Sequence, residues 1–176
     1  GRSTLALQAF VGYKDKPIKR VQVDGGAFEG AFYYPLRYYL GGFGTLRGYP
    51  YFSTAGGKAV FGRASFTFPI FQKVDKELPP FFFDKIYGVF FLETGATGDF
   101  GRLRDIFDGA KLDINKDAFL TDWGFELRMQ MFSNYGLSMF GYFQIAFPTR
   151  KQIPDRNDPT FMQDIDGRRI YFGFSI

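Results

Sequence analysis

The chain of 176 residues contains neither cysteine nor histidine. Without these side chains it cannot form a disulfide, a thiolate metal site, a Cys-His dyad or a Ser-His-Asp triad from its own residues. No segment approaches the run of about 18 apolar residues that a membrane-spanning helix needs. The 22 basic residues are scattered among 18 acidic ones, so the net charge of +4 does not indicate nucleic-acid binding.

Aromatic residues, by contrast, are abundant. The 25 Phe, 11 Tyr and one Trp make up 21% of the chain, which is typical of a membrane barrel with a lipid-facing band and two interfacial girdles. The chain opens with Gly1 rather than Met and shows no signal peptide, so we expect it to be processed or cut from a longer polypeptide.

Alternation of apolar and polar residues predicts long antiparallel strands. They cover residues 4–13, 59–71, 86–94, 119–132, 135–147 and 168–176. These lengths suit the roughly 9 to 11 residues that a tilted transmembrane strand needs, and they exceed the usual length in soluble proteins. Long connectors alternate with a shorter one at 72–84, which contains Pro79-Pro80, and with a tight turn at Ser133-Asn134, as in outer-membrane barrels. A further hairpin within 21–34, with Asp24-Gly25-Gly26 as its turn, would add two strands.

The two faces of the strand predicted over 119–132 differ most clearly. Across all strands, we expect one set of residues to face lipid: Phe66, Phe68, Trp123, Phe125, Leu127, Met129, Leu137, Phe143 and Phe172. The opposite set should face the interior: Arg63, Glu126, Arg128, Gln130 and Gln144. We interpret Asp122, Glu126 and Arg128 as a hydrated lining, because carboxylates four residues apart on one strand are about 13 Å apart, too far for glycosidase chemistry.

Residues 40–50 form a glycine-dense stretch with one arginine near its tip. Gly41, Gly42, Gly44 and Gly48 permit positive φ and close backbone approach, so the stretch is predicted to fold into a compact finger instead of a strand. It is not a phosphate loop, because no G-K-[ST] follows and no helix begins there. Arg47 is then either a charge that meets a buried partner or a solvated residue of a surface turn.

The pattern Gly41-Gly42, a short spacer and Leu46-Arg47-Gly48-Tyr49 resembles the conserved loop of the outer-membrane superfamily of BamA-like insertases and FhaC-like two-partner secretion transporters. Phe91-Leu92-Glu93-Thr94-Gly95 resembles the F-x-D-x-G element of that family, with Glu93 in place of Asp. In the family the loop folds into the lumen of a sixteen-stranded barrel, where its arginine meets this carboxylate. The resemblance therefore implies an ion pair between Arg47 and Glu93.

The resemblance extends to residues 62–71, 122–148 and 170–176 and departs from the family at two positions. Ser65 stands where the family normally carries a second acidic residue, four positions before a proline. Ile176 stands where the family commonly ends in an aromatic residue. Because Ser65 replaces the second acidic residue, the resemblance does not support a clamp in which two carboxylates hold the loop.

The sequence thus predicts an all-β fold. Residues 1–176 are expected to be the C-terminal part of an antiparallel transmembrane β-barrel, with about six to eight strands and a long inward-folded loop. About six strands are too few to close a barrel, since the smallest membrane barrels have eight, so other strands must complete the wall. The candidate site is a lock between loop and lumen, formed by Gly41, Gly42, Leu46, Arg47, Gly48, Tyr49 and Glu93.

By resemblance, the expected role is insertion or translocation of polypeptides at the bacterial outer membrane, as in bacterial surface antigens of this type. It implies no enzyme activity, no cofactor and no metal. The expected partners are membrane lipid, the remaining strands of the parent barrel or another chain, and polypeptide substrates, but not nucleic acid. Two alternatives stay open: a membrane anchor or exporter for a passenger domain upstream of Gly1, and a small barrel that binds an apolar ligand.

Overall fold

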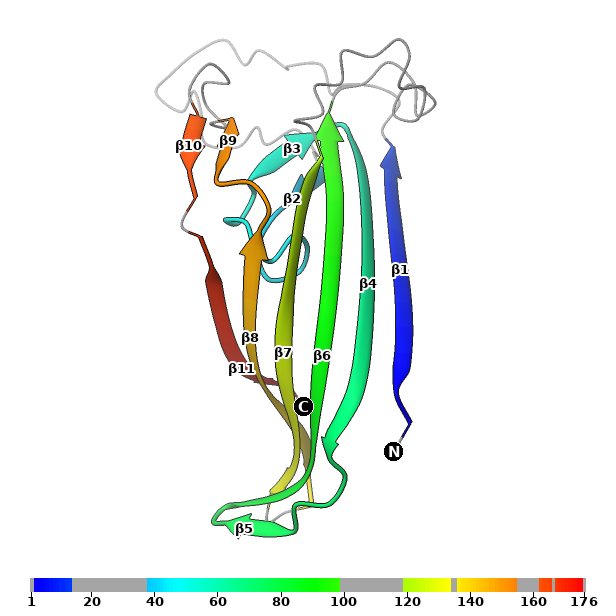
Figure 1. Ribbon diagram of the computed structural model, residues 1–176, viewed down its shortest axis with the longest axis vertical. Helices are drawn as coiled ribbons and strands as arrows, with labels where there is room; N and C mark the ends of the chain where they lie inside the picture. Colours follow the sequence, from blue (N-terminus) through cyan, green and yellow to red (C-terminus); the bar gives the residue numbers. More distant parts are fainter. Residues whose placement is uncertain are drawn as a thin grey trace, which may run out of the picture.

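The computed structural model describes residues 2–13, 38–98, 119–133, 136–154, 162–165 and 167–175. These residues form an all-β structure built on a seven-stranded antiparallel sheet (Figure 1). Its strands follow the order β1-β4-β6-β7-β8-β11, and β5 pairs with β6 at one end. Their bounds are β1 Thr4–Tyr13, β4 Lys58–Phe71, β5 Lys76–Leu78, β6 Phe81–Gly98, β7 Leu120–Ser133, β8 Ser138–Pro148 and β11 Arg169–Ser175.

Two smaller antiparallel pairs accompany the main sheet. β2 (Tyr38–Leu40) pairs with β3 (Thr54–Gly56), and β9 (Gln152–Pro154) pairs with β10 (Met162–Asp164). The residues between β2 and β3, 41–53, contain the glycine-rich stretch, and we call this segment the docked loop. The hairpin predicted within 21–34 lies outside the described residues. No helix long and apolar enough to cross a membrane occurs in the part of the chain that the structure describes.

The predicted strands agree with β1, β4, β7, β8 and β11 to within three residues at each end. The prediction for β6 was wrong in extent, because this strand has 18 residues and runs well beyond 86–94. The connector predicted at 72–84 contains β5 and the start of β6. Pro79-Pro80 forms a turn between them, and the ladder resumes at once with Leu78 opposite Phe81. Glu93 therefore lies inside its strand and not near the strand end.

The turn between β7 and β8 is longer than the predicted pair Ser133-Asn134. The amide of Ser133 donates to the carbonyl of Leu137 at 3.0 Å, and Gly136 adopts a positive φ of 76°. As a result Phe132 pairs with Ser138. Leu137 precedes β8 and is 55% exposed.

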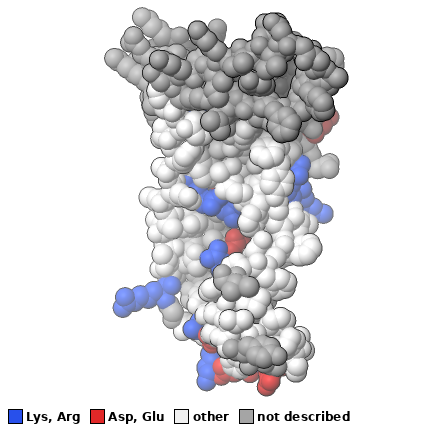
Figure 2. All heavy atoms as spheres, turned by 180° about the vertical axis from the view of Figure 1, so that it is seen from behind, with Lys and Arg blue, Asp and Glu red and all other residues white. Residues whose placement is uncertain are grey.

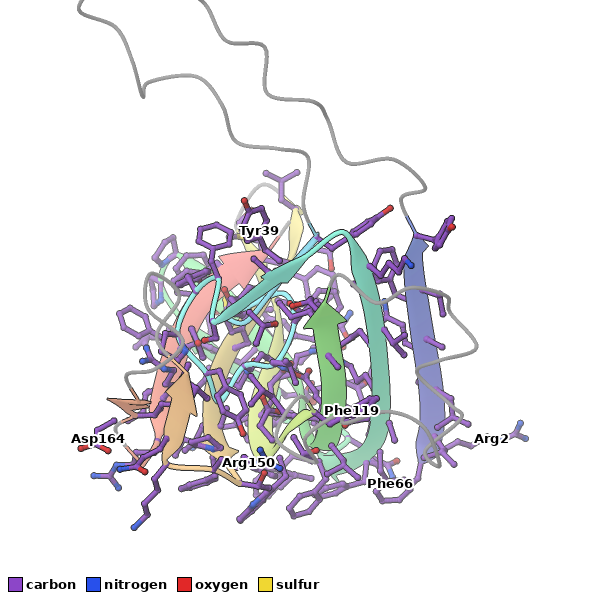
Figure 3. All side chains as sticks on the ribbon, turned by 90° about the horizontal axis from the view of Figure 1, so that it is seen from above. Arg2, Tyr39, Phe66, Phe119, Arg150 and Asp164 are labelled. Carbon is purple, nitrogen blue, oxygen red and sulfur yellow. The ribbon has the colours of Figure 1, made fainter. Side chains whose placement is uncertain are left out.

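Strand register gathers polar residues on one face of the sheet. Gln8, Arg63, Glu93 and Asp122 form one row of successive cross-strand partners, and Glu126, Gln144 and Tyr171 form another. Directly paired residues share a face. Because the docked loop lies against these rows, we call this side the loop face. The view along the strands shows the sheet curving around the loop (Figure 3).

The opposite side, which we call the apolar face, carries large uncovered hydrophobic side chains. The exposed side chains on this face include Leu5, Leu7, Val11, Phe66, Phe90, Leu92, Trp123, Phe143, Ile170, Phe172 and Phe174. Phe66 points away from the loop in Figure 3. The predicted separation of Trp123 and Phe143 from Glu126 and Gln144 is confirmed by the register.

The buried core of the described residues lies between the docked loop and the loop face. It contains Leu40, Leu46, Tyr49, Phe61, Leu120, Ile153 and Ile165. Two core members, Leu46 and Tyr49, come from the loop itself and are fully buried. The main sheet therefore buries its apolar contacts against the docked loop, with Leu40 of β2, Ile153 of β9 and Ile165 after β10 added at the same side.

Candidate functional site

The docked loop has the compact shape predicted from its glycines. Gly41 and Gly42 have φ values of 114° and 98°, which favour glycine. A Cβ on Gly41 would collide with the carbonyl oxygen of Pro50. Inside the loop, Gly42 donates its amide to Tyr49 at 3.2 Å and Tyr49 donates its own to Leu46 at 3.0 Å. These bonds close the finger and fix Arg47 at its tip.

Arg47 makes the predicted contact with Glu93. Its Nε donates to Oε1 of Glu93 at 2.8 Å, and its backbone amide donates to Oε2 at 2.9 Å. The guanidinium carbon lies 3.6 Å from the centroid of the Phe91 ring, so the cation is also stacked on an aromatic face. One residue thus binds both oxygens of one carboxylate.

The far end of the Arg47 guanidinium reaches two more strands. Nη1 donates to Oε1 of Gln144 on β8 at 2.9 Å and to Oε2 of Glu126 on β7 at 3.3 Å. The planar, multidentate guanidinium suits such a site, where a lysine could not satisfy all partners at once. Glu126 and Gln144 were predicted to face the interior, but their contact with the loop was not.

A second arginine shares the Glu93 carboxylate. Arg63 on β4 is the direct cross-strand partner of Glu93. Its Nε donates to Oε1 of Glu93 at 2.6 Å, and its Nη2 donates to the carbonyl of Gly44 at 2.8 Å. Arg63 was predicted only to face the interior. The structure gives it two roles, since it compensates Glu93 and holds the loop backbone.

Gly48 passes so close to the sheet that a side chain would not fit. Its amide donates to Oδ2 of Asp122 at 2.7 Å. A Cβ at this position would lie 2.8 Å from both the Asp122 Cβ and the backbone nitrogen of Pro148. The backbone of Pro148 cannot yield as a flexible side chain could. The glycine of the R-G-Y motif is therefore required by close approach.

Tyr49 anchors the loop to the end of β7. Its hydroxyl donates to the carbonyl of Thr121 at 2.9 Å, and the amide of Arg150 donates to the same hydroxyl at 3.4 Å. Its ring belongs to the buried core with Leu46. Tyr49, a member of the predicted lock, therefore packs against the sheet.

The loop also contacts β11, which the sequence did not reveal. The hydroxyl of Tyr171 donates to the carbonyl of Arg47 at 2.9 Å. The ring of Phe43 lies 5.3 Å from that of Tyr142 and 5.6 Å from that of Tyr171, measured between centroids. The loop is therefore attached to β4, β6, β7, β8 and β11.

The carboxylates at this site and the guanidinium group of Arg47 are buried. Glu93 and Asp122 have no exposed surface, and Glu126 and Arg47 are 5% and 6% exposed. Arg47 and Arg63 bind Glu93, and Arg128, whose side chain is 45% exposed, binds Glu126 with Nη2 to Oε1 at 2.6 Å. Asp122 accepts from the Gly48 amide instead. Burial lowers the pKa of the Arg47 guanidinium, and the adjacent Glu93 carboxylate opposes that shift. Arginine stays protonated in proteins, so the ion pair persists.

Two predictions about these carboxylates were wrong. Asp122 and Glu126 are not a hydrated lining, because the loop covers both. The loop also meets more than one carboxylate although Ser65 provides none, since β7 supplies Asp122 and Glu126. Sequence alternation had placed both residues on the correct face. Only the strand register shows that they lie under the loop.

The arrangement is suited to holding a segment in place. The charged groups form ion pairs with one another and hydrogen bonds to the backbone of the docked loop. Within the described ranges, no group of His, Cys, Asp or Glu side chains is placed to hold a metal ion. Asp122 Oδ1 and Gln144 Nε2 are buried without a hydrogen-bond partner among the described residues. These atoms are the least satisfied part of the site.

Comparison of the chain with protein-family models, with curated proteins and with solved structures gave no match. The all-β antiparallel sheet is a finding of the structure. Membership of the outer-membrane superfamily is an inference from the loop motif and its carboxylate.

Proposed function

We propose that this chain is part of the wall of a transmembrane β-barrel in the bacterial outer membrane, of the BamA-like and FhaC-like superfamily. The barrel assists the insertion or translocation of polypeptides. The observation that carries the proposal is the lock between Arg47 and Glu93 on the inner side of a sheet whose other side is apolar. No chemical step is assigned to the chain, because the charged groups of the lock bind each other.

The apolar face supports a membrane setting. Phe172 and Leu7 are 80% and 77% exposed, and Trp123 on the central part of the sheet is 47% exposed. A soluble protein rarely leaves so continuous an apolar surface uncovered. Lipid is the partner that covers such a face in an outer-membrane barrel.

Charged residues near β5 also support a membrane setting, with this end of the sheet in water. Lys73 pairs with Asp75 at 2.8 Å and Lys85 pairs with Asp84 at 3.0 Å, all beside the turn that carries β5. Figure 2 shows charged side chains gathered at this end, with a second group in the middle of the view. A short charged turn fits the water-exposed periplasmic end of a strand hairpin.

The free edges of the sheet indicate that other strands complete the wall. β1 and β11 each pair with a single strand among the described residues. An unpaired backbone group in lipid costs several kcal/mol. The remaining strands of the parent barrel, or of another chain, would pair with these edges.

Lipid exposure can be tested with the single tryptophan of the chain, Trp123. Its fluorescence in liposomes should be strongly quenched by phospholipids brominated on the acyl chain. The matched control is Trp123→Phe combined with Arg128→Trp, which moves the fluorophore to the loop face on the same strand. Equal quenching at both positions, or full solubility without detergent, would refute the membrane wall and favour a small barrel with an apolar ligand.

The role in polypeptide handling needs a separate assay. Liposomes that contain the intact protein should insert another unfolded outer-membrane protein faster than empty liposomes do, and Arg47→Ala should reduce the gain. If insertion is unaffected while a fused upstream domain is displayed on the cell surface, the anchor or exporter function replaces the proposed one.

A further inference from the structure

Strand β11 is held in the described structure by few contacts. Its backbone pairs with β8 and with no other described strand. Its apolar-face residues Ile170, Phe172 and Phe174 are all more than half exposed. Within the described residues, contacts to β11 from outside its ladder with β8 therefore come from the loop face.

On the loop face, Tyr171 makes these contacts. Its hydroxyl binds the Arg47 carbonyl at 2.9 Å and its ring lies against Phe43 of the loop. The next residue on the same face, Gly173, has no side chain. Arg169, on its other side, has a buried Nε without a partner among the described residues. Among the described residues, Tyr171 therefore links the docked loop to this strand.

The position of this link on the loop is informative. Tyr171 binds the carbonyl of the residue whose amide and side chain bind Glu93. A loop that withdraws from Glu93 carries the Arg47 carbonyl away from Tyr171, because the two contacts belong to the same residue. Arg47 therefore contacts both Glu93 on β6 and Tyr171 on β11, although β7 and β8 lie between these two strands.

We infer that Tyr171 is a positioning residue that couples docking of the loop to the order of edge strand β11. The strand is held while Arg47 is bound to Glu93 and loosens when the loop withdraws. This inference goes beyond the proposed function, because it concerns the loop and the strand whatever the barrel carries. It can hold even if polypeptide insertion is not the role of the protein.

Hydrogen exchange of the intact protein in detergent micelles tests the coupling. Tyr171→Phe keeps the ring and removes the hydroxyl. The amides of β11 that bond to β8 should then exchange about three- to tenfold faster, the range expected for the net contribution of one hydrogen bond, while β4 and β6 are unchanged. Tyr142→Phe is the matched control, since its ring also stacks on Phe43. It should leave β11 exchange unchanged.

Arg47→Ala provides the second arm, because among the described residues the Arg47 side chain bonds to β6, β7 and β8 and not to β11. It should accelerate β11 exchange as Tyr171→Phe does, and the double variant should be no faster than Arg47→Ala alone. Unchanged β11 exchange in Tyr171→Phe would overturn the inference. A uniform acceleration in all strands, or additive effects of the two changes, would also overturn it, since both indicate independent losses of stability.

Discussion

The two faces of β7 carry opposite combinations of polarity and exposure. On the loop face, Asp122 and Glu126 are charged and almost completely buried. On the apolar face, Trp123 is 47% exposed, and Phe125 and Leu127 are partly exposed. In a soluble domain the charged residues would be outside and the aromatic residue inside.

This reversal shows where each face obtains its stability. The carboxylates are tolerated inside because guanidinium groups and backbone amides of the loop compensate them. The apolar face has no protein partner in the described residues, so its stability depends on the surrounding medium. The loop face is therefore sensitive to the loss of single partners, and the apolar face is sensitive to the addition of charge.

The largest effect is expected from Glu93→Ala. The change leaves Arg47 and Arg63 without the carboxylate that they share, and an uncompensated buried charge typically costs about 3 to 5 kcal/mol. Urea unfolding in liposomes, followed by Trp123 fluorescence, measures the loss of free energy of unfolding. Glu77→Ala on exposed β5 is the control and should be nearly neutral.

A double-mutant cycle sharpens this prediction. Arg47→Ala should also destabilise the protein, and the double variant with Glu93→Ala should lose less than the sum of the two single losses. Strict additivity would mean that the contact between Arg47 and Glu93 contributes no coupling energy.

On the apolar face, Leu127→Arg should lower the free energy of unfolding in lipid by about 2 to 4 kcal/mol if the site lies near the bilayer midplane. Gln130→Arg, on the loop face of the same strand, should have a much smaller effect. The comparison is made in liposomes, where only the first side chain would face acyl chains. Equal losses for the two variants would contradict the assignment of the faces.

Gly48→Ala should destabilise the docked loop by about 1 to 3 kcal/mol, the usual cost of forcing a methyl group into a filled space. The added Cβ would lie 2.8 Å from Asp122 and from the Pro148 backbone. Gly44→Ala is a matched control within the same loop, because nothing lies within 4 Å of a Cβ there. Protease susceptibility of the loop reports docking directly. Similar susceptibility of both variants would exclude close approach as the reason for Gly48.

The smallest effect is expected from Tyr49→Phe, about 0.5 to 1.5 kcal/mol, because it removes the bond to Thr121 and the long bond from the Arg150 amide at 3.4 Å. The Thr121 carbonyl that loses this donor still accepts from the amide and the hydroxyl of Thr149, at 3.0 Å and 2.7 Å. We therefore expect a value at the lower end of the range. Tyr51→Phe serves as the control, because Tyr51 is 60% exposed. A loss as large as that of Glu93→Ala would show a role for the hydroxyl beyond this bond.

The sequence was sufficient for features that depend on local pattern. Alternation identified the two faces of β7, and the glycines identified the finger that presents Arg47. Glu93 stood out because it is one carboxylate in a run of apolar and aromatic residues. The family resemblance then joined Arg47 to Glu93, a contact over 46 positions that local pattern alone does not specify.

The other contacts of the lock depend on strand register, which the sequence did not determine. A two-residue turn at Ser133-Asn134 would place Gly141 opposite Glu126, whereas the longer turn places Gln144 there. Such shifts change every cross-strand pair. Arg63, Asp122 and Tyr171 could not be assigned to the loop for the same reason. The start of β6 was missed because Pro79-Pro80 was interpreted as the end of regular structure instead of a turn within a hairpin.

The order of the docked loop in the chain has a consequence for folding. The loop precedes the strands of most of its partners, and its bonds to Asp122, Gln144 and Tyr171 span 74, 97 and 124 positions. Contacts of such long range form slowly, since the entropy of closing a long loop must be overcome first. During synthesis Arg47 emerges before any of these partners exists. Docking of the loop must therefore be a late folding event, which takes place once β6, β7, β8 and β11 lie in register.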